Sequence, residues 1–394
     1  ITMAGFASND QIINALSLGQ TWNAPFGKNF NPTAAAVANE WHMMARGAGN
    51  PPADALFDTG ANLTFIPVED TTTSAGCLQH GGDVQPSGYY KYLISGHVVT
   101  AAATTVPCTI ALLDVIGYYR VTTVTTTSAQ ATTNTISSRT ATFTADDTTD
   151  IMTYTSFTNS PRNLLTGTRV RFTTTTTLPA PLATATDYYL IKITDTTYKL
   201  ATSYANAIAG TAIDITTTGT GTHTINWLLP RYTNGAGVQA IIFNPAATAM
   251  GAGTPNLSLG YTNSTQTASR ATPTVLPIGK TAASNSHILY TGATGTGKYN
   301  YMMPLQAGDA GIAEINTIQN STSYVSGTYT VALVKEIGRF PISTLGLASE
   351  RNFLFEYPSM PRIYDGAALY FALGSGVATP ASSAISGQLN FVWG

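Results

Sequence analysis

The chain has 394 residues, of which 43% are hydrophobic and only 10% are charged, and its formal net charge is −2. The length allows two or three domains, and the hydrophobic content excludes a disordered chain. A typical soluble domain carries about 25% charged residues. We therefore expect a surface of uncharged polar side chains, partly buried against copies or partners. Without a basic excess, no nucleic-acid partner is expected, because binding requires phosphate neutralisation.

The cysteines, Cys77 and Cys108, are too few for a disulfide framework. Two free buried thiols are the favoured interpretation, and a single bridge is the alternative. No apolar run approaches the roughly 18 residues of a membrane helix. The start at Ile1 lacks the charged and apolar regions of a signal peptide. We expect no membrane partner.

The N-terminal region, residues 1–55, is predicted to be an arm with short helices. Ser8 and its neighbours can cap a helix over residues 11–18, which Gly19 would close. A second helix is predicted over residues 31–47.

In that second segment, Asn31 suits the N-cap and Pro32 the first helical position. Val37, Trp41 and Met44 would share one face at i, i+4 and i+7. This face is expected to pack on the rest of the protein. The alternative is that it docks on a neighbouring subunit.

Residues 56–138 and 228–394 are predicted to form a discontinuous antiparallel β-sandwich or jelly-roll-like body. Apolar runs separated by clusters of Gly, Pro, Asn and Ser are typical of this class. The expected strands cover residues 89–100, 109–119, 238–243, 328–334, 367–373 and 388–393.

Residues 139–227 are predicted to be a small all-β domain inserted into the body. Threonine dominates this stretch, with an unbroken run at 173–177 and a second cluster at 216–224. Threonine is β-branched, so it suits strands and loses side-chain freedom in helices. The predicted domain is therefore a β module whose surface carries hydroxyl groups.

The order of four pieces, residues 165–182, 187–193, 198–201 and 213–224, resembles a small β module that recurs in virion proteins of tailed bacteriophages. The resemblance covers about residues 141–226. The flanking body is similar to uncharacterised tailed-phage structural proteins, on residues 231–235, 349–354 and 358–367. Neither resemblance brings a catalytic residue.

The resemblance implies a structural component of a virion, assembled in the cytoplasm of a bacterial host. The low charge, the N-terminal arm and the inserted domain make a capsid decoration or cement protein on the particle exterior the preferred role. Expected partners are copies of the chain in a trimer or other symmetric oligomer, the major capsid protein and other virion proteins. Host surface glycans are a further option. Alternatives are a tail tube, tail fibre or receptor-binding protein, and then a non-phage adhesin or filament subunit.

Two glycine-rich motifs are candidates for nucleotide sites. Residues 292–298 match a P-loop up to Lys298, but Tyr299 replaces the Mg²⁺-binding Ser or Thr and Pro304 interrupts the helix that should follow. Residues 235–240 match GxGxxA but precede a predicted strand instead of a helix. Both are interpreted as turns, and no cofactor is expected.

The sequence signals for a metal site or a catalytic site are equally weak. Of the histidines, only His80 has a cysteine close by, at Cys77, and no further zinc ligands are evident. The acidic cluster Asp146, Asp147 and Asp150 could bind Ca²⁺ but fits a solvated turn better. A glycan hydrolase would need converging carboxylates, for which the candidates are Glu350, Glu356 and Asp365. We expect no enzyme activity and assign no catalytic, cofactor-binding or metal-binding residue.

Overall fold

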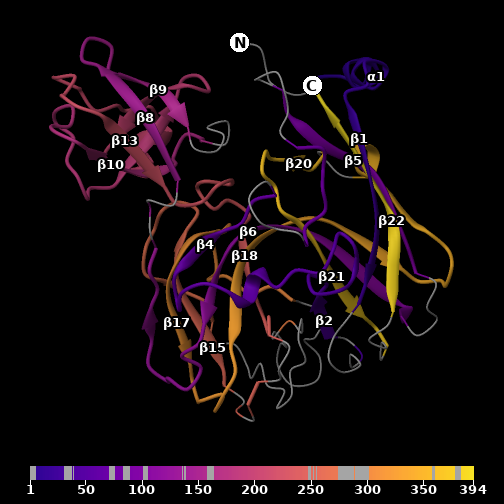
Figure 1. Cartoon of the computed structure of the whole chain (residues 1–394). Coiled ribbons are helices and arrows are strands. Elements are labelled where there is room, and N and C mark those ends of the chain that lie inside the picture. The colour runs from indigo at the N-terminus through magenta and orange to yellow at the C-terminus, as the bar shows by residue number, and fades with distance from the viewer. Residues whose placement is uncertain are drawn as a thin grey trace.

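The computed structural model describes residues 6–30, 38, 40–70, 76–82, 89–100, 105–134, 136, 139–157, 164–246, 250–251, 253, 255–273, 288, 301–356, 360–377 and 383–394. The expected fold class is confirmed: the protein is mainly β, with antiparallel sheets, few helices and a small separate β domain. Figure 1 shows the small domain standing beside a larger body.

A central sheet organises the body. In the described chain its strand order is β14 (Gln239–Phe243), β18 (Tyr329–Ile342), β6 (Cys108–Val121), β21 (Leu369–Ser375) and β2 (Glu40–Met43), with β4 (Phe65–Pro67) also paired to β6. β6 and β18 pair over nearly their whole length. β6 is buried on both faces, as expected of the middle strand of a covered sheet.

Two further sheets pack against the central one. The first has the order β19 (Ser349–Asn352), β5 (Lys91–Thr100), β22 (Ala384–Trp393), β1 (Thr21–Asn29) and β3 (Gly49–Asn50), with β20 (Arg362–Ile363) paired to β5. The second has the order β16 (Arg270–Ala271), β15 (Leu257–Asn263), β17 (Ile312–Asn320) and β7 (Gln130–Ala131).

The short helices lie outside these sheets. They are α1 (Asn9–Ser17), the 3₁₀ turn η1 (Leu56–Asp58), α2 (Tyr204–Ala209) and α3 (Phe353–Glu356). Ser8 caps α1 by accepting a hydrogen bond from the backbone N–H of Gln11, as the sequence predicts.

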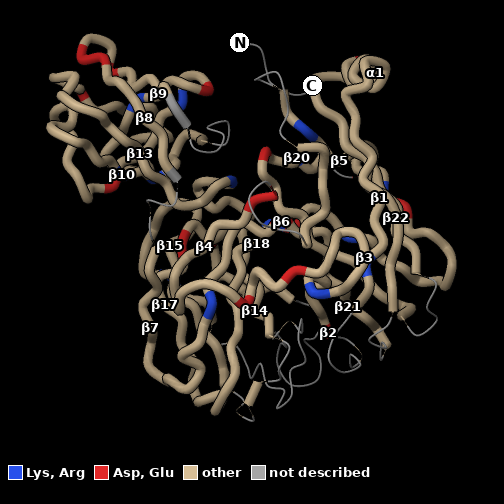
Figure 2. The backbone as a smooth tube through the Cα atoms, in the orientation of Figure 1, with Lys and Arg blue, Asp and Glu red and all other residues tan. Residues whose placement is uncertain are grey.

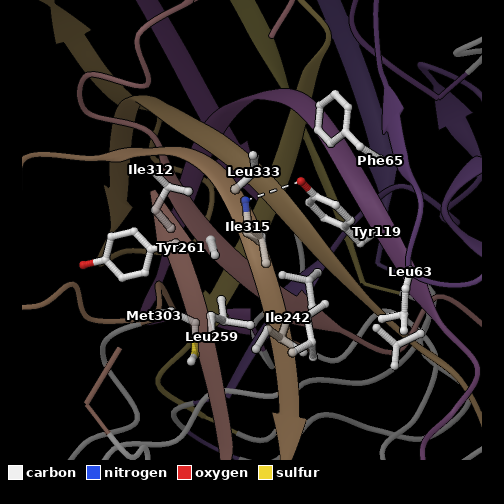
Figure 3. Close-up of a cluster of buried hydrophobic side chains, with 14 of the residues drawn as sticks. Leu63, Phe65, Tyr119, Ile242, Leu259, Tyr261, Met303, Ile312, Ile315 and Leu333 are labelled. Carbon is white, nitrogen blue, oxygen red and sulfur yellow. Dashed lines mark hydrogen bonds between the residues drawn. The ribbon is translucent and has the colours of Figure 1, made fainter. Parts of the chain in front are cut away.

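Side chains along β6 point alternately to the two faces of the central sheet, and they belong to different hydrophobic clusters of the core. Ile110 and Leu112 belong to a cluster shared with β1, β5 and β22. Beyond a bulge in the pairing with β18, Tyr119 and Val121 belong to a second cluster, shared with β15 and β17. Figure 3 shows this second cluster, in which the backbone N–H of Ile315 donates to the Tyr119 hydroxyl. Burial raises the pKa of Tyr119, so this hydroxyl stays protonated at neutral pH.

Between these two clusters lies a buried ion pair. Asp114 follows Ile110 and Leu112 in the alternation of β6, and its carboxylate accepts hydrogen bonds from Nε of Arg231 at 2.8 and 3.1 Å. Neither side chain is exposed to solvent. Arg231 also donates to the carbonyls of Val68 and Val115, and the N–H of Ala368 donates to Asp114. The pair joins four segments of the body at one point.

The structure corrects the predicted helix over residues 31–47. Residues 40–43 form β2, which pairs with β21, and all four side chains are buried. Trp41 packs against Tyr301, with ring centroids 4.2 Å apart. The open edge of β21 supplies backbone partners, so tertiary pairing overrides the helical spacing of the apolar residues. Residues 31–37 and 39 lie outside the described residues.

The expectation of a helical N-terminal arm also differs from the structure. Residues 21–29 form β1, which pairs with β22 from end to end and with β3 on its other side. Of the predicted helical content, α1 is what the described residues show before residue 55. Most of this region is therefore part of the sheets.

The small domain is a closed barrel in the order β10 (Arg169–Thr174), β11 (Tyr188–Lys192), β12 (Thr197–Ala201), β9 (Ile151–Phe157), β8 (Arg139–Asp146) and β13 (His223–Trp227). Alternate side chains fill its interior, including Phe143, Phe172, Leu190 and Trp227. No residue of this core belongs to the clusters of the body. The barrel has a hydrophobic core of its own.

Lys28 on β1 is almost fully buried, and its ammonium donates to the carbonyls of Ala45, Pro51 and Pro52 at 3.2, 2.8 and 2.8 Å. Replacing Lys28 by methionine is expected to lower the free energy of unfolding by about 1–3 kcal/mol, because buried carbonyls lose their donor. Denaturant titration measures this change.

The same pair of proteins should differ in their pH dependence. Burial lowers the pKa of Lys28 from 10.5 to about 8. Between these values the unfolded state binds one more proton than the folded state, so this group makes stability rise with pH. The wild type should gain stability relative to Lys28→Met from pH 8 to pH 10. Parallel pH profiles of the two proteins would contradict the assignment.

Candidate functional site: the threonine surface of the barrel

The two threonine clusters of the sequence meet at one end of the barrel. β10 and β13 pair from Val170–Trp227 to Thr174–His223, and the chain continues the ladder beyond them. The N–H groups of Thr175 and Thr177 donate to the carbonyls of Thr222 and Thr220, both at 3.1 Å. The threonine run is thus one side of an extended hairpin-like ribbon, which we call the threonine ribbon (residues 173–177 and 216–224).

Some hydroxyls of the threonine ribbon hold its backbone in place. Thr175 Oγ1 accepts from the N–H of Thr222 at 2.9 Å, and Thr217 Oγ1 accepts from the N–H of Ala180 at 2.9 Å. Gly219 takes a left-handed backbone with φ of 70°, and a Cβ there would lie 2.6 Å from the carbonyl oxygen of Thr177. A larger residue at Gly219 would force the two sides of the ribbon apart.

Most threonines of the ribbon, including Thr175 and Thr217, are exposed to solvent. The exposed ones are Thr173, Thr175, Thr176, Thr177, Thr216, Thr217, Thr218, Thr220 and Thr222. The threonine ribbon itself contains no Lys, Arg, Asp or Glu, whereas Figure 2 shows charged residues elsewhere on the barrel. A hydroxyl both donates and accepts hydrogen bonds. This surface can bind polar, uncharged groups of a protein or a sugar, without the salt sensitivity of a charged surface.

Asp146 and Asp150, from the acidic cluster of the sequence, stabilise the fold of the barrel. Asp146 accepts from the backbone N–H groups of Thr148 and Thr149 at 2.8 and 3.2 Å, which lowers its pKa. Asp150 accepts from the N–H of Ile215 at 2.9 Å and lies 3.6 Å from Lys199. Asp146 therefore stabilises a turn, and Asp150 connects two segments of the barrel.

No group of three or more His, Cys, Asp or Glu suited to hold a metal ion occurs among the residues that the structure describes. Cys77 and Cys108 are both buried, and no disulfide joins them. The His80 ring contacts Asp70 at 3.0 Å through Nε2 and Lys91 at 3.1 Å through Nδ1. The histidine of the Cys77–His80 pair thus belongs to a buried polar cluster in the body.

Two of the three carboxylate candidates come together. Glu350 and Glu356 line one polar pocket of ≈ 370 Å³ with His97 and Asn390, and Asp365 is not part of its lining. Glu356 accepts from Nη1 of Arg351 at 2.6 Å, and this hydrogen bond, with one from the backbone of Asn352, lowers its pKa. A glycosidase acid needs a raised pKa, so Glu356 is poorly suited to that role.

The structure describes one of the two glycine-rich motifs. At residues 235–240, Gly235 has a φ of 81°, and a Cβ there would lie 2.3 Å from the carbonyl oxygen of Ile312. The motif is therefore a turn that passes close to β17 and leads into β14, as the sequence predicts. Residues 292–298, which resemble a P-loop, lie outside the described residues.

Comparison with known proteins does not assign the chain to a family. No known family model matches the chain, and no curated protein resembles it significantly. In the described part of the chain, no helix is long and apolar enough to cross a membrane.

Proposed function

We propose that the protein is a structural subunit of a tailed-bacteriophage virion, a decoration protein bound to the capsid exterior. The observation that carries the proposal is the separate barrel, which has its own core and an exposed threonine ribbon without charged residues, standing beside a β-sheet body (Figure 1). A subunit that is held by its body and presents a projecting domain suits the outside of a particle.

The body offers side chains for such attachment. Ile13, Leu16 and Leu18 at α1, and Trp22 at the start of β1, are 44–66% exposed. Ile12 and Ala15 are the buried residues of α1. Exposed apolar groups of this kind favour contact with another protein. We assign this face to the major capsid protein or to a second copy of the chain, in a trimer or other symmetric oligomer.

The test is the location of the protein in purified particles. Antibody labelling and a density map of virions from the phage that encodes the chain should place it on the capsid lattice, in a fixed ratio to the shell subunit. Its absence from the particle, or its presence at the tail tip only, would contradict the proposal.

The threonine ribbon favours one alternative, a tail fibre or receptor-binding protein. Exposed hydroxyls without charge can hydrogen-bond to glycans on a host surface. The purified protein would then adsorb to host cells, and capsids would lack it. A tail tube, an adhesin or a filament subunit remains a weaker proposal, without an observation that singles it out.

A further inference from the structure

A pocket of ≈ 430 Å³ lies where the barrel meets the body. Leu165 lines it from the barrel side, and Tyr232, Lys335, Arg362 and Tyr364 line it from three segments of the body. Ligand pockets in proteins commonly have volumes of about 300–1,000 Å³. The size therefore suits a small molecule of one or two rings.

Arg362 on β20 lies against two aromatic rings. Its Cζ lies 3.5 Å from the centroid of the Tyr90 ring and 4.2 Å from that of Tyr364. Its Nε is buried and has no hydrogen-bond partner among the described residues. A guanidinium stacked in this way can donate only in its own plane, in the fork geometry that matches an oxyanion.

Lys335 on β18 brings a second cation to the same pocket. Its ammonium lies 6.0 Å from the centroid of the Tyr232 ring, and burial lowers its pKa. Tyr232 holds this position with a left-handed backbone, at a φ of 48°, which is unusual for a bulky residue. The backbone conformation and the ring thus shape the wall beside the lysine.

The carboxylate in the lining is already engaged. Glu336 accepts from Nε and Nη2 of Arg339 at 2.7 and 2.9 Å, and it also accepts from the Tyr301 hydroxyl. Lys335 and Arg362 form no ion pair within 4.0 Å among the described residues. Among the described residues the pocket lining therefore combines two cations, Lys335 and Arg362, with one carboxylate that already accepts hydrogen bonds from Arg339 and Tyr301.

We propose that this pocket binds the oxyanion group, carboxylate or phosphate, of a small ring-containing molecule, held between Arg362 and Lys335. The oxyanion accepts in-plane hydrogen bonds from Arg362 and pairs with the ammonium of Lys335. The ring lies against the apolar part of the lining, Leu165 and Ile337. Because the lining comes from both domains, the bound molecule also contacts both.

Calorimetric titration of the full chain with three sugars of similar shape tests the proposal. Glucuronate carries a carboxylate, glucose 6-phosphate carries a phosphate, and glucose is neutral. We expect at least one anionic sugar to bind about tenfold or more tightly than glucose, because charge-assisted hydrogen bonds form only with the oxyanion. The anion that binds identifies the group, carboxylate or phosphate.

Two variants locate the binding. Lys335→Met and Arg362→Gln should each weaken it about tenfold or more. Lys199→Met, which removes a cation on the barrel that pairs with Asp150, is the matched control and should leave it unchanged. Lys335→Met decides the matter if Arg362→Gln disturbs the fold, which circular dichroism reports.

The proposal is overturned if neither anion binds more tightly than glucose, or if Lys335→Met binds as the wild type does. The titration uses the purified protein and requires no particle. Its result is therefore independent of where the protein lies in a virion.

Discussion

Replacing Asp114 by alanine will lower the free energy of unfolding by about 3–5 kcal/mol, because it leaves the buried Arg231 guanidinium without its counter-charge. Arg231 is fully buried, so water cannot solvate the orphaned cation. The N–H of Ala368 also loses an acceptor. Urea denaturation followed by near-ultraviolet circular dichroism measures the loss.

The control is an ion pair of similar chemistry at the surface. Glu356 accepts from Arg351 at 2.6 Å, and both side chains are more than 30% exposed. Glu356→Gln should leave the denaturation curve nearly unmoved, because solvent screens such pairs. Equal decreases in the free energy of unfolding for Asp114→Ala and Glu356→Gln would show that the buried pair contributes no more to stability than the exposed one.

Excision of the barrel, residues 139–227, is expected to leave a folded body. Arg139 and Trp227 are cross-strand partners on neighbouring antiparallel strands, so the two ends of the excised segment lie about 5 Å apart. An Asn-Gly linker can close that gap as a tight turn. The body keeps all three of its own hydrophobic clusters, since none includes a barrel residue.

Differential scanning calorimetry of the excised body, the isolated barrel and the full chain tests this independence. Each part should show its own cooperative transition, and the melting temperature of the body should change by only a few degrees. Excision removes the hydrogen bond between the Thr168 and Thr233 hydroxyls, at 2.6 Å, and the Arg169–Glu314 ion pair, both of which join the barrel to the body. An excised body that aggregates or loses its sheet signal would show that the two domains fold as one.

The strands were predictable where one chemical signal dominated. The apolar runs of β6, β14, β21 and β22 mark buried strands, and the structure has each within a few residues of its expected place. α1 followed from the capping signal at Ser8 and its neighbours, and it begins two residues before the expected start. Apolar runs and helix caps involve residues that are adjacent in the sequence, so a local sequence pattern is enough to predict them.

The β2 error shows the limit of that information. Trp41 and Met44 fit a helical face by spacing, but the decisive partner of residues 40–43 is β21, more than 300 residues further along the chain. Asp114 gave a partial signal, because a carboxylate inside an apolar run must be neutralised. Its partner, Arg231, is 117 residues away, and spacing alone could not identify it.

The candidate pocket was missed for the same reason. Leu165, Lys335 and Arg362 come from three separate segments, and none lies in a motif. The threonine clusters gave a better signal, because composition alone marked both sides of the threonine ribbon. Composition did not show that the two sides pair with each other, which depends on the closure of the barrel.

The buried pair of Asp114 and Arg231 also has a mechanical consequence. β13 leaves the barrel at Trp227, and the chain enters the body through Leu228 and Leu229, both buried, before it reaches Arg231. A pulling force on the barrel is therefore delivered within a few residues to β6. β6 is bonded to β18 over nearly its whole length, so the load is shared among many backbone hydrogen bonds at once. The connection between the domains is short in sequence and resists tension through the middle of the central sheet.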